Sequence, residues 1–68
     1  MDLLEEIRDL VTKAGGVFNG IWETPGGRFA TVTDPRTQST ALTPVAGISL
    51  SSIRKALDRV RQRFEAER

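Results

Sequence analysis

The stretch ETPGGRFATVTDPRTQST, residues 23–40, decides the fold because two turn signals divide it into short segments typical of strands. The TPGG motif at 24–27 predicts a hairpin turn, since proline presets φ and glycine tolerates positive φ. The DPRT motif at 34–37 fits a second turn, with aspartate first and proline second. Thr, Val and aromatic residues around these turns predict strands near 18–24, 28–33 and 39–43. A phosphate-binding reading of the glycines needs a helix after them, where this sequence has a strand.

Helical patterns flank the strands on both sides. Apolar residues recur at helical spacing from Leu3 to Ala14, after Asp2 as a natural N-cap. A second apolar stripe runs from Ile53 to Phe64, and Ser49 can cap its helix, with Ser51 as a second candidate. We therefore expect an α+β fold with the order α-β-β-β-α, a three-stranded antiparallel meander with two helices packed on one face. At 68 residues the chain is expected to form one small domain, 1–68.

Two registers are possible for the first hairpin. A plain four-residue turn pairs Trp22 with Phe29, whereas a turn with a glycine bulge pairs Thr24 with Arg28. We prefer the second register, because it separates a more apolar sheet face from a more polar one. The Asn-Gly pair at 19–20 is read as a bulge or as a late start of the first strand.

The preferred register places Trp22 in the core and leaves the other sheet face uncovered. An exposed phenylalanine and isoleucine together on a sheet face suggest a contact surface. The candidate protein interface is Ile21, Phe29, Thr31 and Thr33. The expected core is Leu3, Ile7, Leu10, Phe18, Trp22, Val32, Leu42, Ile53, Leu57, Val60 and Phe64.

The last helix is rich in cations that could follow a phosphate backbone. Acids dilute these cations, however, and no aromatic residue is interleaved for base stacking, so a solvated helix face is the simpler reading. The candidate nucleic-acid contacts are Arg54, Lys55, Arg59, Arg61 and Arg63.

The composition argues against catalysis. The chain has no His and no Cys, and its net charge is only +1. We expect no catalytic residue, no cofactor, no metal and no membrane span, and we expect a cytoplasmic protein.

The size of the chain favours a binding partner. A chain this short has a thin core, and without disulfides or a metal it gains most from oligomerisation. The expected function is a non-catalytic binding module, most simply a homodimeric protein-interaction, regulatory or inhibitor protein. Small chains without catalytic residues are common among regulators, inhibitors and mobile-element accessory proteins. The alternatives are nucleic-acid binding through the last helix and a small enzyme or phosphate binder.

Overall fold

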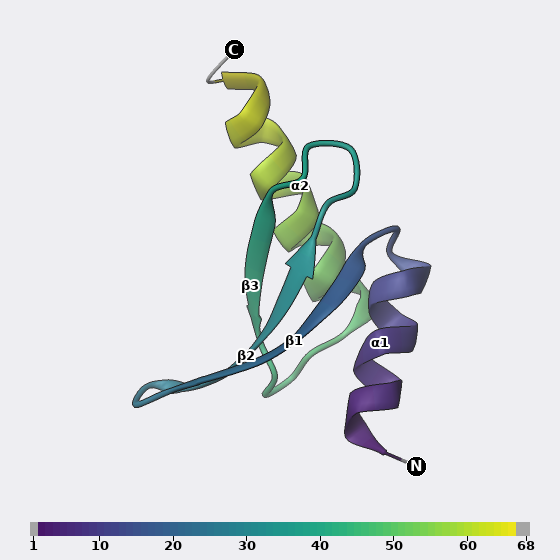
Figure 1. The fold of residues 1–68 in the computed structure, drawn as a ribbon, viewed down its shortest axis with the longest axis vertical. Helices are drawn as coiled ribbons and strands as arrows, with labels where there is room; N and C mark the ends of the chain where they lie inside the picture. Colours follow the sequence, from purple (N-terminus) through teal and green to yellow (C-terminus); the bar gives the residue numbers. More distant parts are fainter. Residues whose placement is uncertain (1, 67–68) are drawn as a thin grey trace.

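The order of elements is the one that the sequence predicts. A computed structural model describes residues 2–66, with helix α1 (Leu3–Lys13), strands β1 (Val17–Thr24), β2 (Gly27–Thr33) and β3 (Thr40–Pro44), and helix α2 (Leu50–Ala66) (Figure 1). The strands form one antiparallel sheet in the order β1-β2-β3. The predicted α-β-β-β-α meander is thus confirmed.

Both helices begin at the residues that the sequence marks as caps. The carboxylate of Asp2 accepts a hydrogen bond from the backbone N–H of Leu4 at 3.2 Å, which satisfies one of the free donors of α1. At α2, the Ser49 hydroxyl accepts from the Ser52 N–H at 3.2 Å, and the Ser52 hydroxyl accepts from the Ser49 N–H at 2.9 Å. This reciprocal pair is a capping box with serine at both positions, and it defines the start of α2.

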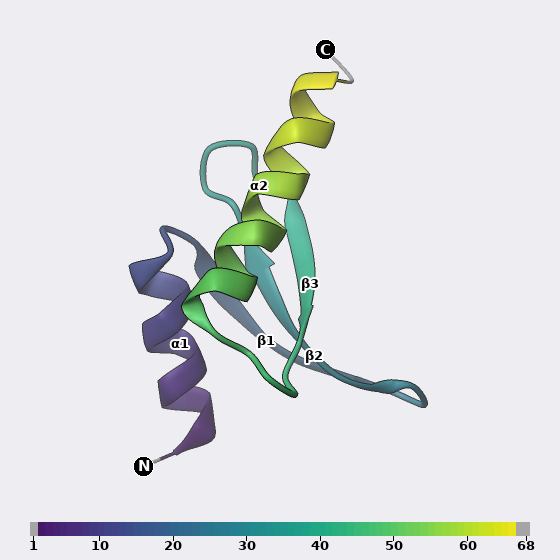
Figure 2. The same cartoon turned by 180° about the vertical axis from the view of Figure 1, so that it is seen from behind.

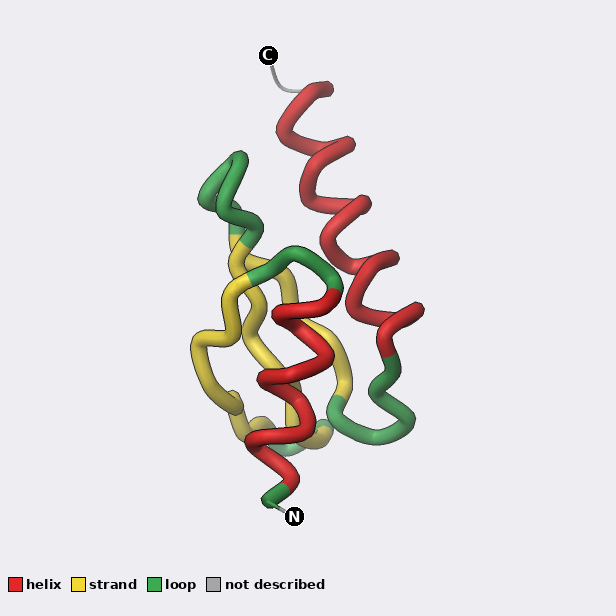
Figure 3. Tube along the Cα trace, turned by 90° about the vertical axis from the view of Figure 1, so that its right-hand side faces the viewer, coloured by secondary structure: helices red, strands yellow, loops and turns green. Residues whose placement is uncertain are grey.

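The core lies between the helices and one face of the sheet. Ile7 and Val11 of α1 meet Val32 of β2, and Ile53 and Leu57 of α2 close the same buried cluster. Figures 2 and 3 show that both helices lie on one side of the strands and leave the other side bare. The joint between α1 and β1 passes close over this cluster: a Cβ on Gly16 would lie only 2.8 Å from Cγ1 of Val32. Glycine at position 16 therefore lets α1 pack against the sheet.

The preferred hairpin register is wrong, and the plain turn is correct. Trp22 is opposite Phe29 and Thr24 is opposite Gly27, so the loop contains only two residues, 25–26. Opposite charges also face each other in this register: Nε of Arg28 lies 3.0 Å from a carboxylate oxygen of Glu23. Both side chains of that pair are exposed, so it marks the register more than it stabilises the fold.

A β-bulge explains the error. The register shifts between Phe18 and Gly20, where β1 carries one residue more than β2. A bulge offsets the alternation of side chains, so Phe18 and Ile21 share the helix-covered face although they are an odd number of residues apart. Trp22 therefore lies on the uncovered face and Ile21 on the covered one, the reverse of the expectation.

The expected core is partly confirmed. Four expected residues are fully buried: Ile7, Val32, Ile53 and Leu57. Leu10, Phe18 and Val60 are half-buried. Four others are exposed, contrary to the prediction: Leu3, Trp22, Leu42 and Phe64. The space is filled instead by Val11, Ala30, Ala41 and Ala56, because small residues let the helices approach the strands closely.

The hairpin turn makes different demands on its two glycines. Gly27 has a φ of 134°, whereas Gly26 has no positive φ. A Cβ would meet no atom within 4 Å at Gly27 and only an ordinary contact at Gly26, so any cost at Gly27 comes from the backbone. Gly27→Ala should lower the free energy of unfolding by about 1–2 kcal/mol, and Gly26→Ala should cost much less. Urea denaturation of the two variants tests this, and equal losses would contradict it.

Candidate protein interface

The uncovered face of the sheet is the most unusual surface of the molecule. In Figure 1 this face is turned toward the viewer, with α2 behind it. The register places three rows of side chains across it, and their residues are Trp22–Phe29–Pro44, Gly20–Thr31–Leu42 and Val17–Thr33–Thr40. We call this surface the open face. Neither helix covers it (Figures 2 and 3), so its apolar side chains have no helix to pack against.

Large apolar side chains are exposed on the open face. Trp22 is 55% exposed, Val17 50% and Leu42 44%, and Phe29 lies half-buried beside Trp22. A single exposed apolar residue is ordinary, but three of them beside a half-buried phenylalanine on one small sheet face are typical of a contact surface. Tryptophan is also the residue most often found at the energetic centre of protein interfaces.

The three strands place no charged side chain on the open face. The strands place only apolar, threonine and asparagine side chains on it, whereas Glu23 and Arg28 lie on the opposite side of the hairpin. Depletion of charge at the centre of a surface is a feature of protein interfaces, because a buried unpaired charge is costly there. A partner can therefore displace water from the open face at a low desolvation free energy.

The polar groups of the open face already have partners. The Thr31 hydroxyl donates to the backbone oxygen of Gly20 at 2.8 Å. The Asn19 side-chain amide donates to the Thr33 hydroxyl, which lies 3.3 Å from the Thr40 hydroxyl. Burying these hydroxyls leaves few hydrogen bonds to replace, so the cost of removing water from this face falls further.

The predicted interface is brought together only in part. Phe29, Thr31 and Thr33 lie on the open face, as expected. Ile21 packs against the core, so its proposed exposure was wrong. The sequence interpretation missed Trp22 and Leu42, which are its largest exposed members. The signal that could have placed Trp22 is the Asn-Gly pair at 19–20. A bulge at this pair shifts the alternation of the side chains after it, which moves Trp22 to the uncovered face.

The basic residues of α2 fall into two environments. Arg54, Lys55, Arg59 and Arg63 are exposed. Arg61 instead points toward the loop after β2, where its Nη2 donates to Oδ1 of Asp34 at 3.1 Å. Arg61 thus anchors α2 to that loop, while the other four candidates keep the exposure that a contact with nucleic acid needs.

Asp34 organises the turn between β2 and β3. It is fully buried, and its second carboxylate oxygen accepts from the Thr37 hydroxyl at 3.0 Å. Its backbone N–H donates to Ser39 O at 2.8 Å, and its backbone oxygen accepts from the Gln38 N–H at 2.7 Å. The hydrogen bond from Arg61 lowers the pKa of Asp34 below its ordinary value, although burial acts in the opposite direction. The carboxylate therefore stays ionised while the turn is closed.

Residues 2–66 contain no group of carboxylates that could hold a metal ion. Within the same range, neither helix has the length and apolar character needed to cross a membrane. The chain matches no protein-family model, no curated protein and no solved structure. Its own surfaces are therefore the basis for any functional conclusion.

Proposed function

We propose that this protein is a non-catalytic binding module that forms a homodimer through its open face. The observation that carries the proposal is the exposure of Trp22, Leu42 and Val17 on a sheet face without charge. Two copies of this face meet without repulsion in a two-fold interface, because each patch then faces its copy.

The length of the chain supports a second copy as the occupant. A domain of 68 residues buries only about 60% of its unfolded surface, so its monomer is marginally stable. Fully burying a Phe or a Leu stabilises by roughly 1.5–3 kcal/mol relative to full exposure, and the half-exposed side chains of the open face would gain roughly half of that. A dimer that covers the open face would add this stabilisation twice, once for each copy.

The dimer is expected to be weak. The central strand β2 has seven residues at about 3.3 Å each, and the three strands lie about 4.8 Å apart, so the open face has a footprint of roughly 14 by 23 Å. This is small beside the roughly 800 Å² that each partner of a standard interface buries. We therefore expect dissociation in the micromolar range, where dilution separates the copies.

The test uses two leucines of equal exposure. Leu42 on the open face and Leu4 on α1 are both 44% exposed. Leu42→Asp should keep the protein monomeric, because a charge would be buried without a partner, and Leu4→Asp should dimerise as the wild type does. Light scattering across a concentration series should show the wild-type mass rise from 7.5 kDa toward twice that value.

The single tryptophan gives an independent signal. Trp22 lies in the proposed interface, so its emission should shift to shorter wavelength as concentration rises, in the wild type and in Leu4→Asp but not in Leu42→Asp. Circular dichroism checks that each variant folds. A wild-type mass that stays at 7.5 kDa at high micromolar concentration, with no shift in emission, would reject the dimer.

Nucleic-acid binding through α2 is the second candidate function. The exposed row of Lys55, Arg59 and Arg63 supports it, since residues four apart lie on one side of a helix. Such binding should weaken steeply as salt rises, because each phosphate contact releases counterions. Titration with a mixed-sequence DNA duplex at low and at high salt tests this candidate.

A further inference from the structure

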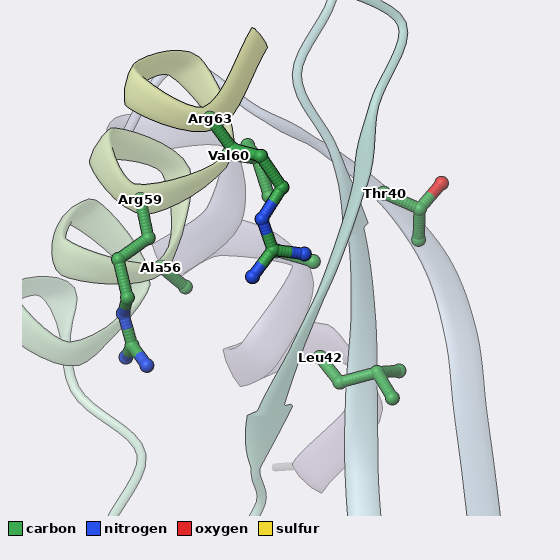
Figure 4. A pocket seen from close by; sticks show the side chains of 7 residues that line it. Thr40, Leu42, Ala56, Arg59, Val60 and Arg63 are labelled. Atoms are coloured by element: carbon green, nitrogen blue, oxygen red, sulfur yellow. The ribbon is translucent and has the colours of Figure 1, made fainter. Parts of the chain in front are cut away.

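A shallow groove separates the outer edge of β3 from α2. Its volume is about 280 Å³, and Figure 4 shows its lining, with Ala56, Arg59, Val60 and Arg63 on α2 and Thr40 and Leu42 on β3. This volume lies just under the range of pockets that enclose a small ligand, but it suits one or two side chains of a polypeptide. The β3 side of the groove is a strand without a neighbour, since the sheet ends there.

The outer edge of β3 carries unpaired backbone groups. Asp34 N–H donates to Ser39 O, and Val45 N–H donates to Arg28 O, so the residues of β3 that bond to β2 are the odd-numbered ones. In an antiparallel ladder the residues between them direct their backbone groups outward. The outward residues are Thr40, Leu42 and Pro44. Thr40 and Leu42 thus offer N–H and C=O groups to an added strand, and Pro44 offers its C=O only.

The groove has a positive wall. Figure 4 shows Arg63 reaching from α2 into the groove toward β3, with Arg59 one turn earlier and the side chains of Thr40 and Leu42 pointing to the far side of β3. No acidic side chain within residues 2–66 pairs with Arg59 or Arg63. Two cations without counter-ions beside a free strand edge favour an extended segment that carries carboxylates.

The spacing of the two arginines matches that of an added strand. Residues four apart on a helix are separated by about 6 Å along its axis. Residues two apart on a strand are separated by about 6.7 Å and point to the same face. Acidic residues at positions i and i+2 of an added strand would therefore face Arg59 and Arg63 in turn.

A second copy of this chain fits the groove poorly. Pairing two β3 edges about a two-fold axis would bring α2 beside the α2 of the second copy. Arg59 and Arg63 of one copy would then face Arg59 and Arg63 of the other. Like charges at that distance oppose such pairing, and Pro44 removes one of the donors. The edge is therefore free for a different chain, whether or not the open face dimerises.

We infer that the β3 edge and the α2 groove bind an extended segment of another polypeptide with acidic residues at alternate positions. The segment adds a fourth strand to the sheet through Thr40 and Leu42, and its carboxylates pair with Arg59 and Arg63. Backbone hydrogen bonds supply a general affinity for extended chains, and the two arginines select the acidic ones.

The probe is a capped peptide of sequence Thr-Glu-Val-Glu-Val-Thr, with Thr-Gln-Val-Gln-Val-Thr as its uncharged control. In an NMR titration of the full chain, the acidic peptide should shift the backbone amides of Thr40 and Leu42 and slow their hydrogen exchange. The control peptide should bind at least tenfold more weakly. These readouts need no variant, so they hold even if a substitution disturbs folding.

The variants separate local recognition from net charge. Arg59→Gln with Arg63→Gln should weaken binding of the acidic peptide at least tenfold. Arg8→Gln with Arg54→Gln removes the same charge from other exposed positions and should change it less than twofold. If both pairs weaken binding equally, or if the peptide shifts no amide of β3, the inference is overturned.

A titration with a mixed-sequence DNA duplex tests whether the groove binds nucleic acid instead of a peptide. If the duplex binds through Arg59 and Arg63 at low salt and the peptide leaves Thr40 and Leu42 unchanged, the groove serves nucleic acid and the peptide inference is wrong. If the peptide protects these amides and the duplex does not bind, the inference stands.

Discussion

Arg61→Gln is expected to lower the free energy of unfolding by about 3 kcal/mol. The guanidinium of Arg61 is the cation that pairs with the fully buried carboxylate of Asp34, and removing one partner of a buried pair leaves an uncompensated charge. The estimate lies at the low end for such pairs because the Arg61 side chain is 31% exposed. Urea denaturation at neutral pH measures the loss.

The matched control is Arg59→Gln, two residues earlier on the same helix. Arg59 is exposed and pairs with no acid within residues 2–66, so its replacement should change stability by less than about 0.5 kcal/mol. Equal losses for the two variants would mean that the contact between Arg61 and Asp34 does not hold α2 to the turn.

The same pair predicts how stability depends on pH. The pKa of Asp34 is lowered in the folded protein, chiefly by the hydrogen bond from Arg61, so the folded state binds this proton less readily than the unfolded chain. Its contribution is complete above the unfolded pKa of about 3.9 and is lost as pH falls through the lower, folded pKa. Arg61→Gln removes the largest cause that lowers this pKa, while the hydrogen bonds from Thr37 and the Arg36 backbone remain. The folded pKa of Asp34 should therefore be higher than in the wild type, and acid destabilisation should begin at higher pH. NMR titration of the Asp34 carboxyl carbon tests both directions.

Leu57→Ala should cost about 2–5 kcal/mol, a large fraction of the total stability of about 5 kcal/mol expected for a small domain. Leu57 is fully buried between α2 and the sheet, where the lost methyl groups leave a cavity among Ile7, Val11 and Val32. Many molecules of this variant should therefore be unfolded at room temperature, as thermal and urea denaturation would show.

Leu42→Ala is the control with the same change of side chain. Leu42 is exposed on the open face, so in the monomer its truncation should cost less than about 1 kcal/mol. The two variants should be compared at a protein concentration below the dissociation constant of the proposed dimer, so that both are monomeric. A loss at Leu42 as large as that at Leu57 would place Leu42 in the core of the monomer and remove it from the open face.

The local sequence predicts the elements and their order well. Asp2 and Ser49 mark the helix starts because their side chains bond backbone donors a few residues away. The prolines and glycines mark the turns because their φ preferences act within one or two residues. Strand limits agree with the expectation to within one or two residues, since these signals need no information from distant parts of the chain.

The candidate surfaces are less predictable because they depend on register. Phe29, Thr31 and Thr33 were placed correctly on the open face, but Ile21 and Trp22 were exchanged. The additional residue in β1 decides whether Ile21 or Trp22 is exposed to solvent. The position of this bulge depends on the pairing with β2 and not on the residues of β1 alone. The role of Arg61 was also missed, because its partner Asp34 lies 27 residues away in the sequence.

The sequence by itself determined the two helices, the three strands, the turns between them and the two apolar stripes that needed a sheet to cover. These features follow from capping, φ preferences and periodicity, which act over a few residues. Only the tertiary structure decided that Trp22 faces outward, that Arg61 is bound to Asp34, and that Arg59 and Arg63 line a groove beside the free edge of β3. Each of these depends on which distant segments pack together, and packing is settled by the whole core at once.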